Sequence, residues 1–182
     1  MLARQMGHRE WISALLSNLG EAASEQGKYT QAEEYFREGL TLARQMEHRE
    51  WISALLINLG LSTRKQGHYV QAEAYLKESL TLARQLGRPE ITSNALYEYG
   101  SLCLIQQHMQ VAEATFREMI STVSEGDQDL IALAQYGLAR AAAAQGNIHE
   151  AHRLGEKSVI ALEAIGHRTA KEVRYWLATI IV

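Results

Sequence analysis

The sequence is poor in several residue types, and each shortage excludes a class of protein. Its 182 residues include one cysteine and one proline. The single thiol, Cys103, excludes a disulfide framework, a cysteine-rich zinc site and a Cys-x-x-Cys redox pair. One proline among many alanine, leucine, glutamate and glutamine residues predicts a mostly helical chain with few irregular loops.

Aspartate and net charge are also scarce. The chain has 19 glutamates but only two aspartates, Asp127 and Asp129, which argues against acidic metal loops. A net charge of -3 argues against nucleic acid or an acidic membrane surface as a partner. No run reaches the roughly 18 apolar residues of a membrane span, and the first residues do not resemble a signal peptide. We therefore expect a cytoplasmic protein without a membrane segment.

What the sequence does contain is an internal repeat. Residues 3–20 recur at 43–60 with 16 of 18 positions identical, and residues 38–45 recur at 78–85 with seven of eight identical. A third copy is more diverged, and a fourth follows at an offset of 39 instead of 40. We divide the single repeat domain, 1–182, into partial unit 1–7, units at about 8–47, 48–87, 88–126 and 127–166, and partial unit 167–182.

Each unit contains two helical patterns separated by a short break. In the first unit Ile12, Leu15 and Leu19 form one apolar stripe, Gly27 ends it, and Thr30 with Glu33 has the spacing of a capping box for the next helix. A helix pair of this size cannot bury both apolar stripes alone, whereas stacked pairs can. The sequence thus predicts an all-α, right-handed α-solenoid of about nine helices, at 9–26, 30–46, 49–66, 70–86, 89–106, 109–124, 127–145, 148–165 and 168–181.

These residues carry a family resemblance. In the first two units the small, apolar and aromatic positions resemble those of the tetratricopeptide repeat (TPR), and a period of 40 is similar to Leu-Gly-Asn-type scaffolds and to the helical arms of bacterial signal-transduction ATPases and regulators. The resemblance implies that the glycine of the first helix lets the two helices of a pair approach closely. The matching residues are Leu16, Asn18, Leu19, Gly20, Ala23, Gly27, Tyr29, Ala32 and Phe36, and then Leu56, Asn58, Leu59, Gly60, Thr63, Gly67, Tyr69, Ala72 and Leu76.

Further features concern the junctions between units, the fourth unit and the two ends of the array. Trp11 and Trp51 occupy the same position of successive units, and we expect both to pack at repeat junctions. The fourth unit departs from the pattern, because Ala139 replaces the glycine and Gly155 replaces the aromatic residue. Both ends of the array lack a polar cap, so we expect a fragment of a longer protein that could also form a homo-oligomer through its ends.

No catalytic constellation is apparent in the sequence. His149 and His152 are spaced i, i+3 and lack the i, i+4 pair of a zinc-protease helix. Cys103 occupies a small-residue position of the repeat, which favours a core thiol over a nucleophile. We therefore predict that the chain is not an enzyme and has no catalytic residues, metal or cofactor.

The resemblance implies a function for the concave face, which the first helix of each TPR pair lines. A protein or peptide ligand bound there is the interpretation we favour, and the alternatives are a sensor arm of a larger signalling ATPase or transcription regulator, a self-association module, or small-molecule sensing. A chaperone-tail ligand does not fit, because Ser17, Glu21, Ile57 and Leu61 replace the lysine and asparagine of carboxylate-clamp TPRs. The predicted groove consists of Ile57, Leu61, Arg64, Tyr97, Ser101, Leu104, Tyr136 and Arg140.

Overall fold

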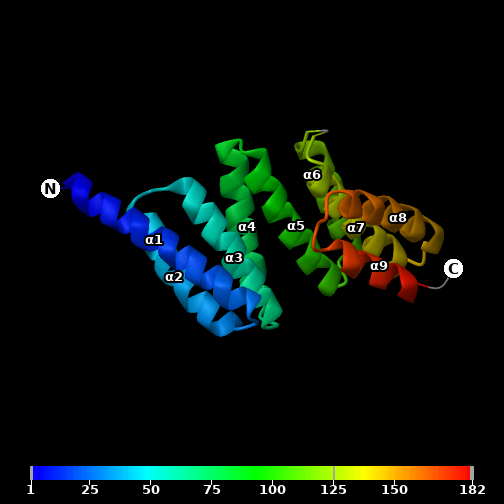
Figure 1. Ribbon diagram of the computed structural model, residues 1–182, viewed down its shortest axis with the longest axis horizontal. Helices are drawn as coiled ribbons and strands as arrows, with labels where there is room; N and C mark the ends of the chain where they lie inside the picture. The colour runs from blue at the N-terminus through cyan, green and yellow to red at the C-terminus, as the bar shows by residue number, and fades with distance from the viewer. Residues whose placement is uncertain (1, 125, 181–182) are drawn as a thin grey trace. The chain divides into compact units, whose positions relative to one another are not determined.

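The chain folds as consecutive helix pairs in two units, Met1–Ile91 and Thr92–Val182. The computed structural model describes residues 2–124 and 126–180, with side chains from residue 7 onward. Nine helices occupy the described part (Figure 1). Unit 1 contains α1 (Leu2–Glu25), α2 (Tyr29–Gln45), α3 (Arg49–Lys65) and α4 (Tyr69–Leu86). Unit 2 contains α5 (Pro89–Ile105), whose first residues belong to unit 1, then α6 (Met109–Thr122), α7 (Gln128–Ala144), α8 (Ile148–Ala164) and α9 (Ala170–Thr179).

Sequence and structure differ most at the start of the chain. The repeat predicts a break near residue 7, yet α1 runs from Leu2 through Gly7 to Glu25 as one helix. At the duplicated position the chain turns, and Glu47 there has a φ of 54°. Residues 2–6 are all good helix formers, which favours a continuous helix through this segment. The other eight helices lie within two residues of their predicted bounds.

The predicted capping box of α2 is wrong. The N-cap of α2 is Lys28, which makes no side-chain capping bond. Thr30 donates instead to Gln66 Oε1 at 3.1 Å, and Glu33 forms an ion pair with Arg37 at 2.6 Å. The helix start depends on the turn before it, where Gly27 has a φ of 74°, a conformation that strains residues with a Cβ.

Close approach of the two helices in a pair is confirmed in three successive repeats. A Cβ placed on Gly20 would lie 2.4 Å from the Phe36 ring, and one on Gly60 would lie 2.5 Å from Leu76. In the third repeat the same construction on Gly100 meets Phe116 at 2.7 Å. Glycine on the first helix therefore makes room for the large side chain sixteen residues later.

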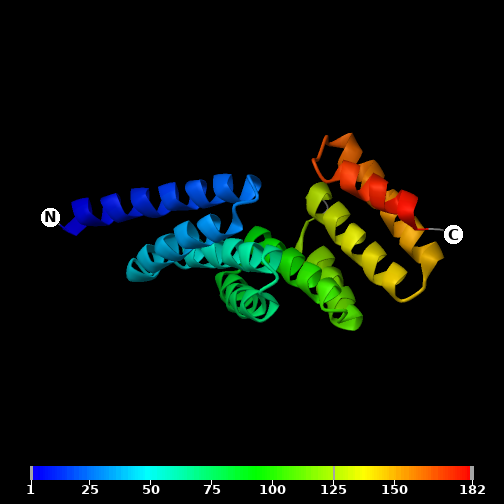
Figure 2. The same cartoon turned by 90° about the horizontal axis from the view of Figure 1, so that it is seen from below.

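In the fourth repeat, the space next to the second helix is filled from a different helix. Its second helix carries Gly155 where the other repeats have a large side chain, and a Cβ there would lie 2.6 Å from Leu177 of α9. A side chain of the following helix thus fills the space. Figure 2 shows α7 and α8 as neighbouring antiparallel helices in unit 2, with α9 beside α8.

Each unit has its own apolar core. In unit 1, Phe36 and Leu40 of α2 pack with Leu55, Leu56 and Leu59 of α3. In unit 2 the core joins residues of α7, α8 and α9, namely Ala132, Tyr136, Val159, Leu162, Ala170, Val173 and Leu177. None of the helices in the described part of the chain combines the length and the apolar character that crossing a membrane requires.

Candidate functional site

A hollow in unit 1 lies between α1 and α3, the first helices of two successive pairs. Its volume is about 200 Å³. The side chains that α1 contributes to the hollow are short. The indole of Trp51 and the methyl group of Ala54 therefore face open space. The lining residues are Ser13, Ala14, Ser17, Asn18, Trp51, Ala54 and Leu55.

Trp51 is held at the edge of this hollow by two contacts. Its ring stacks on the imidazole of His48, with 4.4 Å between the ring centroids. His48 is also the N-cap of α3 and accepts a hydrogen bond at Nδ1 from the backbone N–H of Trp51. Trp51 packs against the core of unit 1, which confirms its predicted place at a repeat junction. For Trp11 that prediction is wrong, because its side chain is 81% exposed.

A carboxylate of α1 lies near the predicted groove residues of α3. Glu21 of α1 accepts hydrogen bonds from Ser17 at 3.3 Å and from Asn58 of α3 at 3.4 Å, which ties the two helices together. Ile57, Leu61 and Arg64, three of the predicted groove residues, follow Ala54 along α3 at spacings of three and four, so all share one face. Each is half-buried, which leaves part of its surface accessible.

Most of the predicted groove residues of unit 2 are buried. Tyr136 is only 3% exposed, because α9 covers it: its hydroxyl donates to Glu172 Oε1 at 3.2 Å, and its ring meets Trp176 edge-on at 5.4 Å. Burial raises the pKa of the Tyr136 phenol well above its usual range, and the Glu172 carboxylate adds to the increase. The phenol is a core group, so its predicted place in an open groove is wrong.

Two more predicted groove residues are buried. Ser101 and Leu104 of α5 lie below the surface, so neither is open to a partner in this structure. Tyr97 is half-buried and meets the Phe116 ring edge-on at 6.3 Å. Arg140 is also half-buried, with its guanidinium carbon 5.6 Å from the centre of the Tyr136 ring. Of the five groove residues predicted in unit 2, Tyr97 and Arg140 therefore keep accessible surface.

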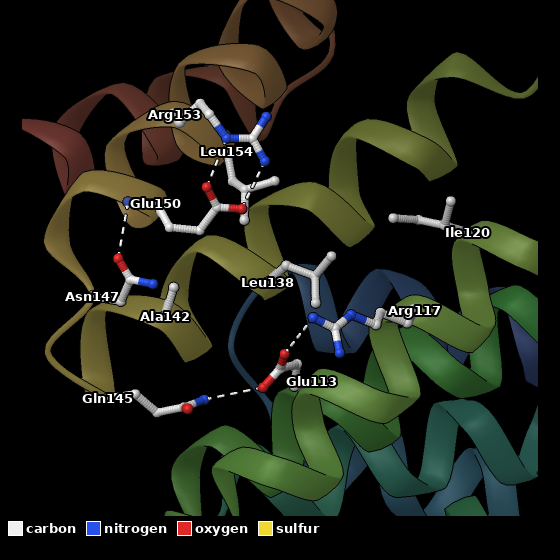
Figure 3. A pocket seen from close by; sticks show the side chains of 10 residues that line it. All are labelled: Glu113, Arg117, Ile120, Leu138, Ala142, Gln145, Asn147, Glu150, Arg153 and Leu154. Atoms are coloured by element: carbon white, nitrogen blue, oxygen red, sulfur yellow. Dashed lines mark hydrogen bonds and ion pairs between the residues drawn. The ribbon is translucent and has the colours of Figure 1, made fainter.

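A larger pocket in unit 2 was not foreseen from the sequence. It lies among α6, α7 and α8, has a volume of about 530 Å³, and combines apolar residues with charged ones (Figure 3). The predicted groove contains only residues of first helices, whereas this pocket draws on both helices of a pair. It is lined by Glu113, Arg117, Ile120, Leu138, Ala142, Gln145, Asn147, Glu150, Arg153 and Leu154.

The polar part of this pocket repeats a link seen in unit 1. Gln145 donates to Glu113 at 3.3 Å and Arg117 pairs with Glu113 at 2.6 Å (Figure 3). In unit 1, Gln66 donates in the same way to Glu33 at 2.8 Å, and Glu33 pairs with an arginine four residues later. Because the same tie joins successive pairs in both units, we interpret it as structural.

The second ion pair of the pocket, between Arg153 and Glu150, is local to α8. The two side chains lie within 2.6 Å, and the hydrogen bond from Arg153 lowers the pKa of the Glu150 carboxyl group. The neighbouring histidines do not converge: His149 is exposed, whereas His152 Nε2 lies 3.1 Å from the carbonyl oxygen of Ile180. Within residues 2–124 and 126–180, no three His, Cys, Asp or Glu side chains gather as metal ligands would.

Two family models match consecutive stretches of the chain. Both are described as tetratricopeptide repeat, one over residues 15–50 and the other over residues 51–122. Together with the paired helices and the glycine contacts, these matches decide the assignment. The chain belongs to the tetratricopeptide repeat family. No curated protein sequence matches it.

Several solved TPR-like structures share the fold. A Rap protein complexed with Competence and Sporulation Factor matches with a TM-score of 0.81 at 12% identity over 92% of this chain. Aspartyl phosphate phosphatase F from Bacillus subtilis matches with a TM-score of 0.78 at 14% identity over 89%, and BtubC from P. vanneervenii with 0.73 at 16% over 87%. This TPR chain spans 48%, 43% and 66% of those three chains. At these identities the likeness shows the fold alone.

Membership of the family indicates a general type of function. TPR domains generally mediate protein–protein interactions and are typically non-catalytic scaffolds. Cys103, the one thiol, is buried as its position in the repeat predicted. The surfaces open to a partner are consequently those that the TPR helices leave uncovered.

Proposed function

We propose that the chain binds a peptide or helix of a partner protein on the first-helix face of unit 1. The observation that carries this proposal is the hollow between α1 and α3, bordered by Trp51 and Ala54. A cavity of about 200 Å³ is large enough for one apolar side chain but too small for a drug-sized ligand. This size favours a peptide with a single anchoring side chain over a small-molecule ligand.

The residues along α3 add specificity to such a site. Ile57 and Leu61 offer apolar contacts next to the hollow, and Arg64 lies beyond them on the same face. Glu21, on the α1 side, supplies a negative charge that would pair with a basic group of the ligand. Because the site lies on stacked helices, little ordering entropy opposes binding, and a few such anchors imply roughly micromolar affinity.

A regulatory role in a larger signalling protein is the second candidate. It is supported by the similarity to the Rap protein, which is complexed with Competence and Sporulation Factor. In that case Tyr97 and Arg140 of unit 2, which keep accessible surface, would add a second contact region. Both candidates require a ligand on the first helices and so share the same test.

The test uses random 12-residue peptides displayed on phage and selected on the immobilised chain. Affinities of the selected peptides, made synthetically, are then measured by fluorescence anisotropy. We expect Ala54→Trp and Leu61→Glu to weaken binding at least tenfold, since the first fills the hollow that would hold the anchoring side chain and the second replaces an apolar contact by a charge. The matched control is Ala74→Trp, because Ala74 is an exposed alanine of α4 outside the hollow, and it should leave affinity unchanged. Unchanged affinity in correctly folded Ala54→Trp and Leu61→Glu variants would refute the proposal.

A further inference from the structure

The pocket among α6, α7 and α8 has an open apolar floor. Ile120 of α6, Leu138 of α7 and Leu154 of α8 are half-buried and line a cavity of about 530 Å³ (Figure 3). Helices α6 and α8 flank the cavity, and both belong to unit 2. The opening is therefore a gap within the stack and not one of its ends.

At the same position of unit 1 the floor is closed. Leu59 of α3 occupies the position that Leu138 has in α7, and it is fully buried. Tyr75 of α4 packs against the core that contains Leu59. In α8 the residue at the position of Tyr75 is Leu154, whose smaller side chain covers less of the floor. The two units thus share this architecture, and unit 2 differs from it by leaving apolar surface accessible.

Two pairs of glutamate and arginine form the polar rim of the pocket (Figure 3). Both carboxylate oxygens of Glu113 already contact a donor, Oε1 from Arg117 and Oε2 from Gln145. Both oxygens of Glu150 accept from Arg153. Among the described residues, Nη1 of each of the two arginines makes no hydrogen bond or ion pair. The rim consequently offers donors, and a hydrogen-bond acceptor suits it better than another donor.

We propose that this pocket binds a small organic carboxylate with an apolar body. The body, an alkyl chain or an aromatic ring, lies on Leu138, and the carboxylate accepts from a guanidinium of the rim. A volume of about 530 Å³ is in the range of small-molecule pockets, roughly 300–1,000 Å³. Burial of apolar surface supplies most of the affinity, because both arginines are mostly exposed and exposed charge contacts contribute little. The arginines determine which polar group the pocket prefers.

The first experiment titrates the full chain with octanoate and with octylamine, which share an alkyl chain and differ in the charge of the polar group. Backbone amide signals in two-dimensional NMR spectra report the binding. We expect saturable shifts in α6, α7 and α8 with octanoate, and roughly threefold weaker binding of octylamine. No saturable binding of octanoate, or octylamine binding as tightly, would overturn the proposal.

Filling the pocket tests its location. Ala142→Phe places a ring over the floor, and Leu154→Tyr restores the residue type that unit 1 has at this position. Each should weaken octanoate binding at least tenfold, because the apolar body loses its space. Unchanged affinity in folded forms of both variants would overturn the proposal.

Removing the donors tests the preference for a carboxylate. The double variant Arg117→Gln/Arg153→Gln should weaken octanoate binding at least threefold and leave octylamine binding no weaker. The matched control is Arg174→Gln, because Arg174 of α9 is held by both oxygens of Glu163 in the way that Glu150 holds Arg153, and it lies outside the pocket. This control should leave octanoate affinity unchanged. Equal effects of the control and the double variant would refute a contact with the rim.

Two further measurements separate this site from other sources of binding. The tripeptide acetyl-Ala-Leu-Leu also ends in a carboxylate, and tighter binding of it than of octanoate would overturn the assignment in favour of a peptide C-terminus. Ala54→Trp, which fills the hollow of unit 1, should leave octanoate affinity unchanged. A loss of octanoate binding in that variant would place the ligand in the hollow instead. Selection of peptides for the hollow does not depend on this pocket, so the two proposals fail independently.

Discussion

At the scale of single residues, the repeats can be compared with one another, because similar buried serines differ in whether their hydroxyl makes a hydrogen bond. Ser53 of α3 is buried and exchanges hydrogen bonds with Ser79 of α4, with 2.9 Å between the hydroxyl oxygens. Ser13 and Ser158 each make a similar bond across a helix pair, to the carbonyl oxygens of Gly39 and Ala132. A small hydroxyl thus joins the two helices of a pair in three repeats.

The third repeat breaks this pattern and leads to a prediction. Ser93 is fully buried, and its hydroxyl has no hydrogen-bond partner among the described residues. An unsatisfied buried hydroxyl costs about 1–3 kcal/mol. We expect Ser93→Ala to raise the free energy of unfolding by about 1 kcal/mol, and Ser53→Ala, which breaks a satisfied bond, to lower it by a similar amount. Urea denaturation checks both, and a loss of stability in Ser93→Ala would contradict the assignment.

At the scale of helices, glycine acts in opposite ways according to its neighbours. Gly60 of α3 has Leu76 of α4 where its Cβ would lie, whereas Gly7 of α1 has nothing within 4 Å. Both lie inside helices, where glycine is less favourable than alanine by about 1 kcal/mol. Packing, not propensity, therefore decides the effect of a substitution at Gly60.

The two glycines give a matched prediction. Gly60→Ala should lower the free energy of unfolding by about 1–3 kcal/mol because it overpacks the α3–α4 pair, and Gly60→Leu should lower it further. Gly7→Ala should instead raise stability slightly, by about 0.5–1 kcal/mol, since only helix propensity changes. Thermal and urea denaturation followed by circular dichroism measure both effects. Equal effects at the two positions would show that the close approach at Gly60 relaxes without cost.

Helix positions were predictable from the sequence because apolar spacing and turn glycines act locally. Eight of nine helices lie within two residues of the prediction, and Pro89 begins α5 as a first-turn proline should. The start of α1 was not predictable from the repeat. The duplicated sequence adopts a turn at Glu47 but stays helical at Gly7.

At the scale of the whole molecule, the candidate site depends on neighbours that sequence positions do not reveal. Ile57 and Leu61 keep accessible surface on α3, and their role in a binding groove stays a prediction. Tyr136 was misplaced, because α9 folds over it and supplies Glu172 and Trp176. Position within the repeat predicts which side of a helix a residue faces, whereas exposure also depends on the next helix in the stack.

Stacked repeats also predict how the molecule opens. In a solenoid each repeat contacts only its neighbours, so a local defect should weaken the unit that contains it more than the other unit. Leu56 in unit 1 and Leu162 in unit 2 are both fully buried, and truncating such a leucine to alanine typically costs about 2–5 kcal/mol. These two leucines are therefore matched probes of the two units.

Native-state hydrogen exchange, resolved by helix, distinguishes local from global opening. We expect Leu56→Ala to speed amide exchange in α2, α3 and α4 while α7, α8 and α9 keep most of their protection, and Leu162→Ala to do the reverse. The reason is that Leu56 belongs to the core cluster of unit 1 and Leu162 to that of unit 2. Equal loss of protection in all helices with either variant would mean that the chain opens as one cooperative body, and the nearest-neighbour description of its stability would fail.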